Sequence, residues 1–300
     1  MSARKLITEH LGLWTGAVTQ KSTRGRGNSG KIDLIGVRKL QQLVLELGIR
    51  GKLVPQDPDE TPAVSLIERV SANKSELLRT GEIKKSHKLP EIAPDEVEFT
   101  VPTGWHWARL GELTQKIGSG ATPRGGKSAY VATGIPFLRS QNIWNDGVAL
   151  QDVALITPET HERMSNTQVY PNDILLNITG ASLGRCTIVS TTLETANVSQ
   201  HVTIIRTIEP ISRQYLHHLI LSPYGQSMIW SRQVGVAREG LSKKVLELFE
   251  MPVPPLEEQN RIVQKVDELM ALSDQLKERL NQASETRCQL ANTVVEAALG

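Results

Sequence analysis

The sequence predicts an α+β protein: a mixed α/β domain followed by one long helix of the coiled-coil type, with a helical region at the N-terminus. Three observations support this fold class. Residues 256–299 contain neither proline nor glycine and repeat apolar residues every three or four positions, as a long packed helix does. Residues 102–205 carry short runs rich in Val, Ile and Thr between glycines, which is typical of strands. Residues 6–18 and 35–47 have helical apolar spacing.

Length and composition are those of a globular protein with about two structural units. The 300 residues carry a net charge of +2, and no apolar run reaches membrane-spanning length, so we expect a cytoplasmic protein without membrane contact. Two cysteines, Cys186 and Cys288, make neither a disulfide framework nor a metal motif. Residues 21–39 contain six basic side chains and one acidic side chain. This excess is a hint of nucleic acid, although a solvated loop explains it equally well.

Four units follow one another in this interpretation. Residues 1–52 hold the two N-terminal helices and a basic loop, and residues 53–95 form a linker with a polar helix from Ala63 to about Lys85. Residues 96–255 form the α/β domain, and residues 256–300 form the long helix. Inside the domain we expect strands at 135–138, 173–178, 186–189 and 202–205, and helices at 212–221, 223–234 and from Leu241 onward.

The long helix carries an a/d seam of eleven positions, nine of them apolar. At about 1.5 Å per residue, this helix is roughly 65 Å long. A helix with such a one-sided seam is not stable alone, so it must pack against another helix of this chain or of a second copy. The seam consists of Ile262, Val266, Leu269, Ser273, Leu276, Leu280, Ala283, Arg287, Leu290, Val294 and Ala297.

Four stretches of the chain resemble the specificity subunit of type I restriction–modification systems. They are residues 51–58 (GKLVPQDP), 102–113 (PTGWHWARLGEL), 118–123 (GSGATP) and 252–263 (PVPPLEEQNRIV). The last is the most specific, and the glycine-rich stretch alone is weak. Residues 102–113 resemble the entry to a target-recognition domain, and residues 252–263 resemble its exit into the spacer helix. The resembling segments cover almost the whole chain.

The resemblance implies a subunit that recognises DNA and catalyses nothing. Members of the family have two recognition domains, each reading half of a split site, and two antiparallel helices between them. This chain departs from the pattern because it shows one such domain and one long helix, so it looks like a half-subunit. Two copies paired through the helix would read an inverted repeat. The residues expected at the dimer or partner interface are Ile262, Val266, Leu269, Leu276, Leu280, Leu290, Val294, Leu40, Leu43 and Leu47.

Loop residues of the domain have the chemistry that DNA contacts require. Arg, Asn, Gln and small hydroxyls present donors and acceptors to base edges, and Lys and Arg bind phosphates. We expect the stretch Gln200–His201 to be structural instead. The candidate DNA-binding residues are Ser119, Thr122, Arg124, Lys127, Arg139, Gln141, Asn142, Thr179, Ser182, Arg185, Arg238 and Lys243.

The resemblance also implies partners. A modification subunit would bind S-adenosylmethionine and flip the target adenine, and a restriction subunit would use ATP and Mg²⁺. No cofactor is expected in this chain. The alternatives that stay open are a coiled-coil adaptor and a decoy that binds modification subunits without conferring a new DNA specificity.

Local motifs favour no enzyme. Asp59 with Glu82 and Lys84 imitates a nuclease metal motif, but these residues lie in a connector and a polar helix. The stretch 125–128 (GGKS) lacks the earlier glycine of a phosphate loop. No cofactor loop for methyl transfer and no histidine spacing for a metal is present. A standalone DNA-cleaving enzyme would nick DNA with Mg²⁺, and Glu82→Ala would abolish the nicking.

Overall fold

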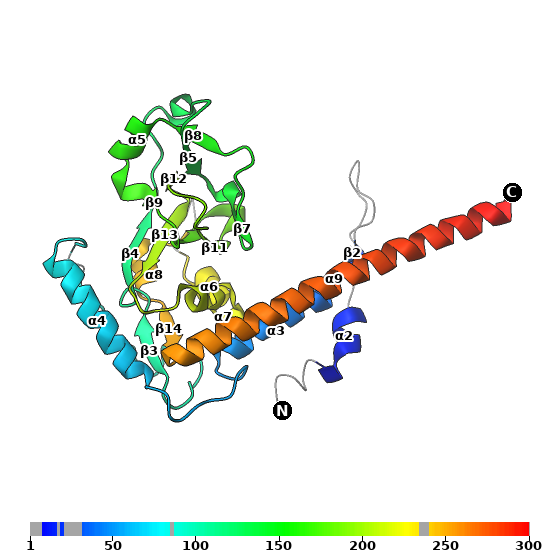
Figure 1. Ribbon diagram of the computed structural model, residues 1–300, viewed down its shortest axis with the longest axis horizontal. Coiled ribbons are helices and arrows are strands. Elements are labelled where there is room, and N and C mark those ends of the chain that lie inside the picture. The colour runs from blue at the N-terminus through cyan, green and yellow to red at the C-terminus, as the bar shows by residue number, and fades with distance from the viewer. Residues whose placement is uncertain (1–7, 17–18, 21–31, 85–86, 234–239, 300) are drawn as a thin grey trace.

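The computed structural model describes residues 8–16, 19–20, 32–84, 87–233 and 240–299. A sheet-rich domain stands at one end of the molecule, and the helix α9 (Leu256–Leu299) runs from its base far beyond it (Figure 1). This arrangement confirms the predicted α+β fold with a long C-terminal helix. Most of the basic N-terminal loop, the candidate Arg238 and the last residue, Gly300, lie outside the described residues.

Two four-stranded sheets share a hydrophobic core in the domain. The central sheet is antiparallel, with the order β11 (Cys186–Ile188), β10 (Ile174–Asn177), β13 (Val202–Thr207) and β4 (Thr114–Ser119). The upper sheet has the order β8 (Ala154–Ile156), β5 (Ile135–Leu138), β12 (Ala196–Val198) and β9 (Gln168–Val169), with β5 and β12 parallel. Side chains alternate across the central sheet: Leu175 and Ile204 face the core shared with the upper sheet, whereas Leu176 and Ile205 face the helices.

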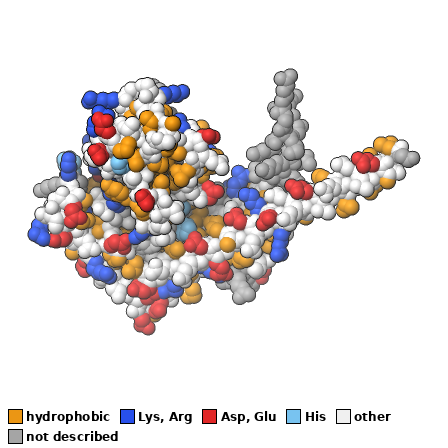
Figure 2. All heavy atoms as spheres, turned by 45° about the horizontal axis from the view of Figure 1, so that its top comes forward, with side chains coloured by type: hydrophobic (Ala, Val, Ile, Leu, Met, Phe, Trp, Pro, Cys, Tyr) orange, Lys and Arg blue, Asp and Glu red, His pale blue; other side chains and the backbone are white. Residues whose placement is uncertain are grey.

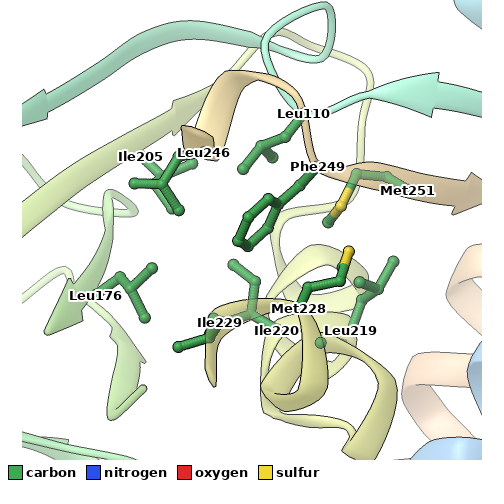
Figure 3. A pocket seen from close by; sticks show the side chains of 11 residues that line it. Leu110, Leu176, Ile205, Leu219, Ile220, Met228, Ile229, Leu246, Phe249 and Met251 are labelled. Atoms are coloured by element: carbon green, nitrogen blue, oxygen red, sulfur yellow. The ribbon is translucent and has the colours of Figure 1, made fainter. Parts of the chain in front are cut away.

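Helices cover the other face of the central sheet. They are α6 (Arg213–Leu221), α7 (Pro223–Ser231) and the short α8 (Lys243–Glu247). Serine side chains at Ser212, Ser222 and Ser242 accept a backbone N–H and so fix each helix start. The apolar side chains between sheet and helices point toward one another (Figure 3) and leave no room for a water molecule. This region is therefore packed core and not a ligand pocket.

The chain enters and leaves the domain side by side. Strand β3 (His106–Arg109) pairs antiparallel with β14 (Glu250–Val253), which directly precedes α9. The Arg109 side chain is 2% exposed, and its Nη1 lies 2.6 Å from the Glu250 carboxylate. Its Nη2 binds both carboxylate oxygens of Glu96, at 2.9 and 2.8 Å. The sequence interpretation did not include this strand pair, because each strand is short and its partner lies far along the chain.

Helix α3 (Ile35–Ile49) packs antiparallel against the first part of α9, so of the two partners expected for the seam, this part uses a helix of the same chain. Ile262 and Val266 are each 1% exposed within one chain. A Cβ on Gly48 of α3 would lie 3.2 Å from Ile262 Cγ2, so this glycine permits the close approach. The Gln41 amide donates to Asp274 Oδ1 at 3.0 Å further along the contact. Leu40 is buried in the same core.

The second half of α9 has no such cover from the described residues. Leu290 is 60% exposed and Val294 is 67% exposed. Hydrophobic side chains are visible on the part of the helix that projects from the body of the molecule, near its tip (Figure 2). The predicted interface residues thus fall into three classes. Ile262, Val266 and Leu40 are buried inside the chain, Leu43, Leu47, Leu269, Leu276 and Leu280 are half-buried, and Leu290 and Val294 are open.

The remaining elements are short. Helix α2 (Leu11–Gly16) lies beside α3. It falls within the helix expected at residues 6–18, of which residues 8–16 are described. Helix α4 (Ala63–Arg79) stops six residues before the expected end, and its buried face packs near β3. None of the helices in the described ranges is both long and apolar enough to cross a membrane. The other elements are β1 (Thr19–Gln20), β2 (Ile32–Asp33), β6 (Ile143–Trp144), β7 (Gly147–Val148) and α5 (Pro158–Arg163).

Candidate nucleic-acid interface

The predicted contact residues come mainly from three loops of the domain. The first loop follows β4, the second follows β5, and the third connects β10 to β11. These loops bring several of the candidate side chains into two neighbouring groups. Hydroxyl groups dominate the first group, and arginines dominate the second.

The hydroxyl group lies where β4 ends and β13 begins. Ser119 Oγ is 3.1 Å from Thr203 Oγ1 on the neighbouring strand, and Thr122 Oγ1 donates to the Gln200 side chain. Thr179 Oγ1 is 2.7 Å from His201 Nδ1. Gln200 and His201, which we expected to be structural, therefore hold two of the predicted contact residues. Because Gln200 is exposed, it also presents polar atoms to solvent beside them.

The arginine group consists of Arg139 on the loop after β5 and Arg185 on the loop between β10 and β11, beside the hairpin β6–β7. Arg139 has its guanidinium carbon 5.9 Å from the centre of the Tyr130 ring, and its Nη2 donates to Asp152 O at 3.3 Å. Its Nε–H is buried and has no acceptor among the described residues. Arg185 lies over the Trp144 ring, with 3.9 Å between the guanidinium carbon and the ring centre. Gln141 is exposed on the loop between them.

Asn177 at the end of β10 joins the two loops. Its Nδ2 donates to Ser140 O at 2.8 Å, and its backbone N–H donates to Arg185 O at 2.8 Å. Asn177 is fully buried, so its side chain fixes one loop and its backbone the other, both from inside the protein. Ser182 belongs to the same connection, since its carbonyl accepts the Arg185 N–H at 3.1 Å. The loop after β10 therefore starts at the hydroxyl group, with Thr179, and ends at the arginine group.

The Arg185 backbone is supported from below by α6. The next residue, Cys186, is buried, and its carbonyl accepts a hydrogen bond of 3.0 Å from His217 Nε2. Burial lowers the pKa of His217 to about 4, because the charged ring loses its hydration in the core. The histidine is therefore neutral at pH 7 and carries its proton on Nε2. Burial also raises the pKa of the Cys186 thiol, which keeps it protonated.

Not every candidate joins these groups. Asn142 is 1% exposed: its Oδ1 accepts the Arg139 N–H at 3.0 Å and its Nδ2 donates to Ala149 O at 2.9 Å. This corrects the expectation that Asn142 faces DNA, because its polar atoms are used to shape the loop. Arg124 and Lys127 are exposed on the first loop. Lys243 pairs with Glu247 at 3.4 Å along α8.

Trp144 and Asn177 were missed by the sequence interpretation. A tryptophan beside the turn-forming stretch 145–147 (NDG) was the available signal, because a large aromatic next to a hairpin turn is exposed unless something covers it. Asn177 gave no such signal. Within the described part of the chain, no three His, Cys, Asp or Glu side chains gather closely enough to hold a metal ion.

Comparisons with known proteins identify relatives. A family model described as the type I restriction modification DNA specificity domain matches residues 102–285. The specificity subunits of the type I restriction enzymes EcoAI and EcoEI from Escherichia coli are both 34% identical to the chain across 98% of its length. The chain spans 50% of the first and 49% of the second, so it has about half the length of these relatives.

A solved structure concerned with complex assembly and conformational transition of a type I R-M system has a similar fold. The TM-score is 0.55 at 18% identity, and the match covers 98% of this chain and 68% of that one. At this identity the likeness concerns the fold alone.

Proposed function

The chain belongs to the family of type I restriction–modification DNA specificity domains, and on this premise we propose that it recognises a DNA sequence for a type I restriction–modification complex. Its own work in this proposal is binding, and it performs no chemistry. The sheet-rich domain supplies the contacts to DNA. A modification subunit would supply S-adenosylmethionine and methyl transfer, and a restriction subunit would supply ATP-dependent cleavage.

The observation that carries the proposal is the pair of arginines around Gln141. Neither Arg139 nor Arg185 has a carboxylate partner among the described residues, whereas buried or packed arginines elsewhere do. Positive groups held in place without a neutralising acid are suited to a polyanion. Gln141 and the nearby hydroxyls add donors and acceptors that can read base edges. Charge and hydrogen-bonding groups thus occur together on two adjoining loops.

DNA binding can be tested with the purified chain. A random duplex library would be selected on it, and the affinity for the selected site would be measured over a series of salt concentrations. We expect one sequence motif and an affinity that falls steeply with salt, since phosphate contacts release counterions. Arg139→Ala and Arg185→Ala should each lower the affinity at least about five-fold. Arg163→Ala on α5 is the matched control, because Arg163 is an exposed arginine that pairs with Glu159.

The result that contradicts this function is a folded chain that selects no motif and shows no salt-dependent affinity. That outcome would favour the adaptor or the decoy. A chain that binds a modification subunit but adds no new methylated motif in cells would favour the decoy in particular.

We further propose that two copies associate through the open C-terminal part of α9, residues 285–299, which is about 22 Å of helix. The support is its exposed apolar seam, with Leu290 and Val294 more than half exposed and no partner helix among the described residues. Two copies related by a two-fold axis would present two identical domains and read an inverted repeat.

Light scattering tests the association directly. We expect the mass of a dimer for the wild-type chain and of a monomer for Leu290→Asp, with the same circular dichroism. Glu285→Asp on the same exposed half is the control and should stay dimeric. A monomeric wild-type chain at micromolar concentration would exclude the self-association, and an asymmetric selected motif would point to a different second domain.

A further inference from the structure

The exposed ring of Trp144 is fixed in one orientation. Its hairpin is anchored by the fully buried Ile143, which pairs with Val148 across the two strands. The indole Nε1–H donates to Gln141 O at 3.0 Å, although the side chain as a whole is 46% exposed. The indole is therefore both oriented and half-exposed, so its ring is available to support another side chain.

Arg185 differs from the other arginines that lie on aromatic rings. Arg50, Arg206 and Arg232 also contact Phe or Tyr rings, but each is paired with a carboxylate at 2.6 Å. Arg139 donates to a backbone carbonyl. In the described part of the chain, the Arg185 side chain has neither an ion pair nor a hydrogen bond in addition to its stacking on Trp144. Its guanidinium is therefore held by one face, while its N–H donors stay available.

The backbone on both sides of this stack is also fixed. The Cys186 N–H donates to Asn145 Oδ1 at 3.2 Å, so the residue after Arg185 is bound to the residue after Trp144. Asn177 holds the Arg185 carbonyl from the other side. The ring, the hairpin turn and the neighbouring strand are thus all fixed, and the Arg185 guanidinium lies over the face of the fixed indole.

A fixed orientation of the Arg185 guanidinium matters more for a contact to a base edge than for a contact to a phosphate. The guanidinium presents two parallel N–H groups whose spacing matches O6 and N7 of guanine in the major groove. A phosphate contact needs charge at a suitable distance and tolerates rotation, so lysine can replace arginine there. Stacking on Trp144 limits rotation without using the donors, which favours the base contact.

We propose that Trp144 is a positioning residue for specificity: it holds the Arg185 guanidinium in the plane in which it donates two hydrogen bonds to a guanine of the target site. The inference rests on the proposed DNA-recognition function. To that function it adds the type of base, a guanine, and the pair of residues that reads it. In this pair Arg185 contacts the base, whereas Trp144 touches no base itself.

The test is selection of a random duplex library by the full chain and its variants. Trp144→Leu keeps apolar bulk on the hairpin and removes the aromatic face, Trp144→Phe keeps a face, and Arg185→Lys keeps the charge. We expect Trp144→Leu and Arg185→Lys to lose the preference for the same G·C pair, a fall in discrimination of roughly 5- to 150-fold. The salt dependence should stay unchanged in both, and Trp144→Phe should keep most of the preference.

Several outcomes overturn the inference. If Arg185→Lys keeps the whole motif, while Arg185→Ala weakens all sequences equally and lowers the salt slope by about one, Arg185 binds a phosphate. If Trp144→Leu keeps the motif, the ring does not position Arg185. In both cases the wild-type chain still selects a motif, so the proposed function stands. A wild-type chain that selects no motif would contradict both this inference and the proposed function. Should Trp144→Leu fail to fold, Trp144→Ala replaces it as the test of the ring, and Arg185→Lys still decides between a base contact and a phosphate contact.

Discussion

Replacement of Arg109 by methionine should loosen the base of the recognition domain. The Arg109 side chain binds three separate parts of the chain: Glu250 on β14 at 2.6 Å, Leu248 O at 2.8 Å, and the stretch before β3, where both oxygens of Glu96 accept hydrogen bonds. Methionine fills a similar volume but supplies none of these donors. The buried Glu250 would keep only Arg232, also at 2.6 Å, as a charged partner. Removing one member of a buried ion pair typically costs about 3–5 kcal/mol.

Urea unfolding followed by tryptophan fluorescence measures this loss. We expect Arg109→Met to lower the free energy of unfolding by about 3–5 kcal/mol, with an unchanged dependence on urea. Arg109→Lys should recover part of it, because lysine keeps the charge but cannot reach all three sides with a planar fork. Arg163→Met, at an exposed surface pair, should stay close to wild type. A loss below about 1 kcal/mol for Arg109→Met would refute the reasoning, since surface ion pairs contribute that much.

Three further predictions follow from the packing. Ile262→Ala, in the covered half of the seam, should cost about 2–5 kcal/mol in urea unfolding at a fixed protein concentration. Leu290→Ala, in the open half, should instead weaken self-association in sedimentation experiments; the reverse pattern would contradict the division of α9. The folded-state pKa of His217 lies below its unfolded value of about 6.5, so stability is full above pH 6.5 and falls as the pH drops toward 4. His217→Gln should show a shallower fall in urea midpoints over that range, and equal slopes would argue against a buried neutral histidine. Gly120→Ala should destabilise the loop after β4 and weaken DNA binding, because a Cβ there would meet Val198 O at 1.9 Å; unchanged melting and binding would show that the backbone can yield.

The periodic parts of the fold could be predicted because they depend on local spacing. The apolar repeat of residues 256–299 required one long helix, and the runs at 135–138 and 202–205 became strands β5 and β13. The family was also identified from stretches of sequence, and the comparisons confirm it. The pair β3–β14 could not be found this way, since its two strands are separated by 140 residues or more along the chain.

The candidate DNA-contact residues show the same limit. Residue types selected Gln141 and Asn142 together, yet the first is exposed and the second is 1% exposed. The neighbouring residues in the sequence do not predict this difference in exposure, because it depends on which side-chain amide binds the backbone of the folded loop. Likewise, composition marks Arg185 as a cation, but only its stacking on Trp144 distinguishes it from arginines that pair with acids.

The sequence by itself therefore determined the long helix, the α+β class and the family. These follow from periodicity and motifs, which act over a few turns or a few strands of chain. Only the tertiary structure decided that α3 covers the first half of the seam and leaves Leu290 and Val294 open. It also decided that two loops meet through Asn177 to place Arg139 and Arg185 on adjoining surfaces. Which apolar face is covered and which cation is neutralised depend on contacts between distant residues, and these form only when the whole chain packs.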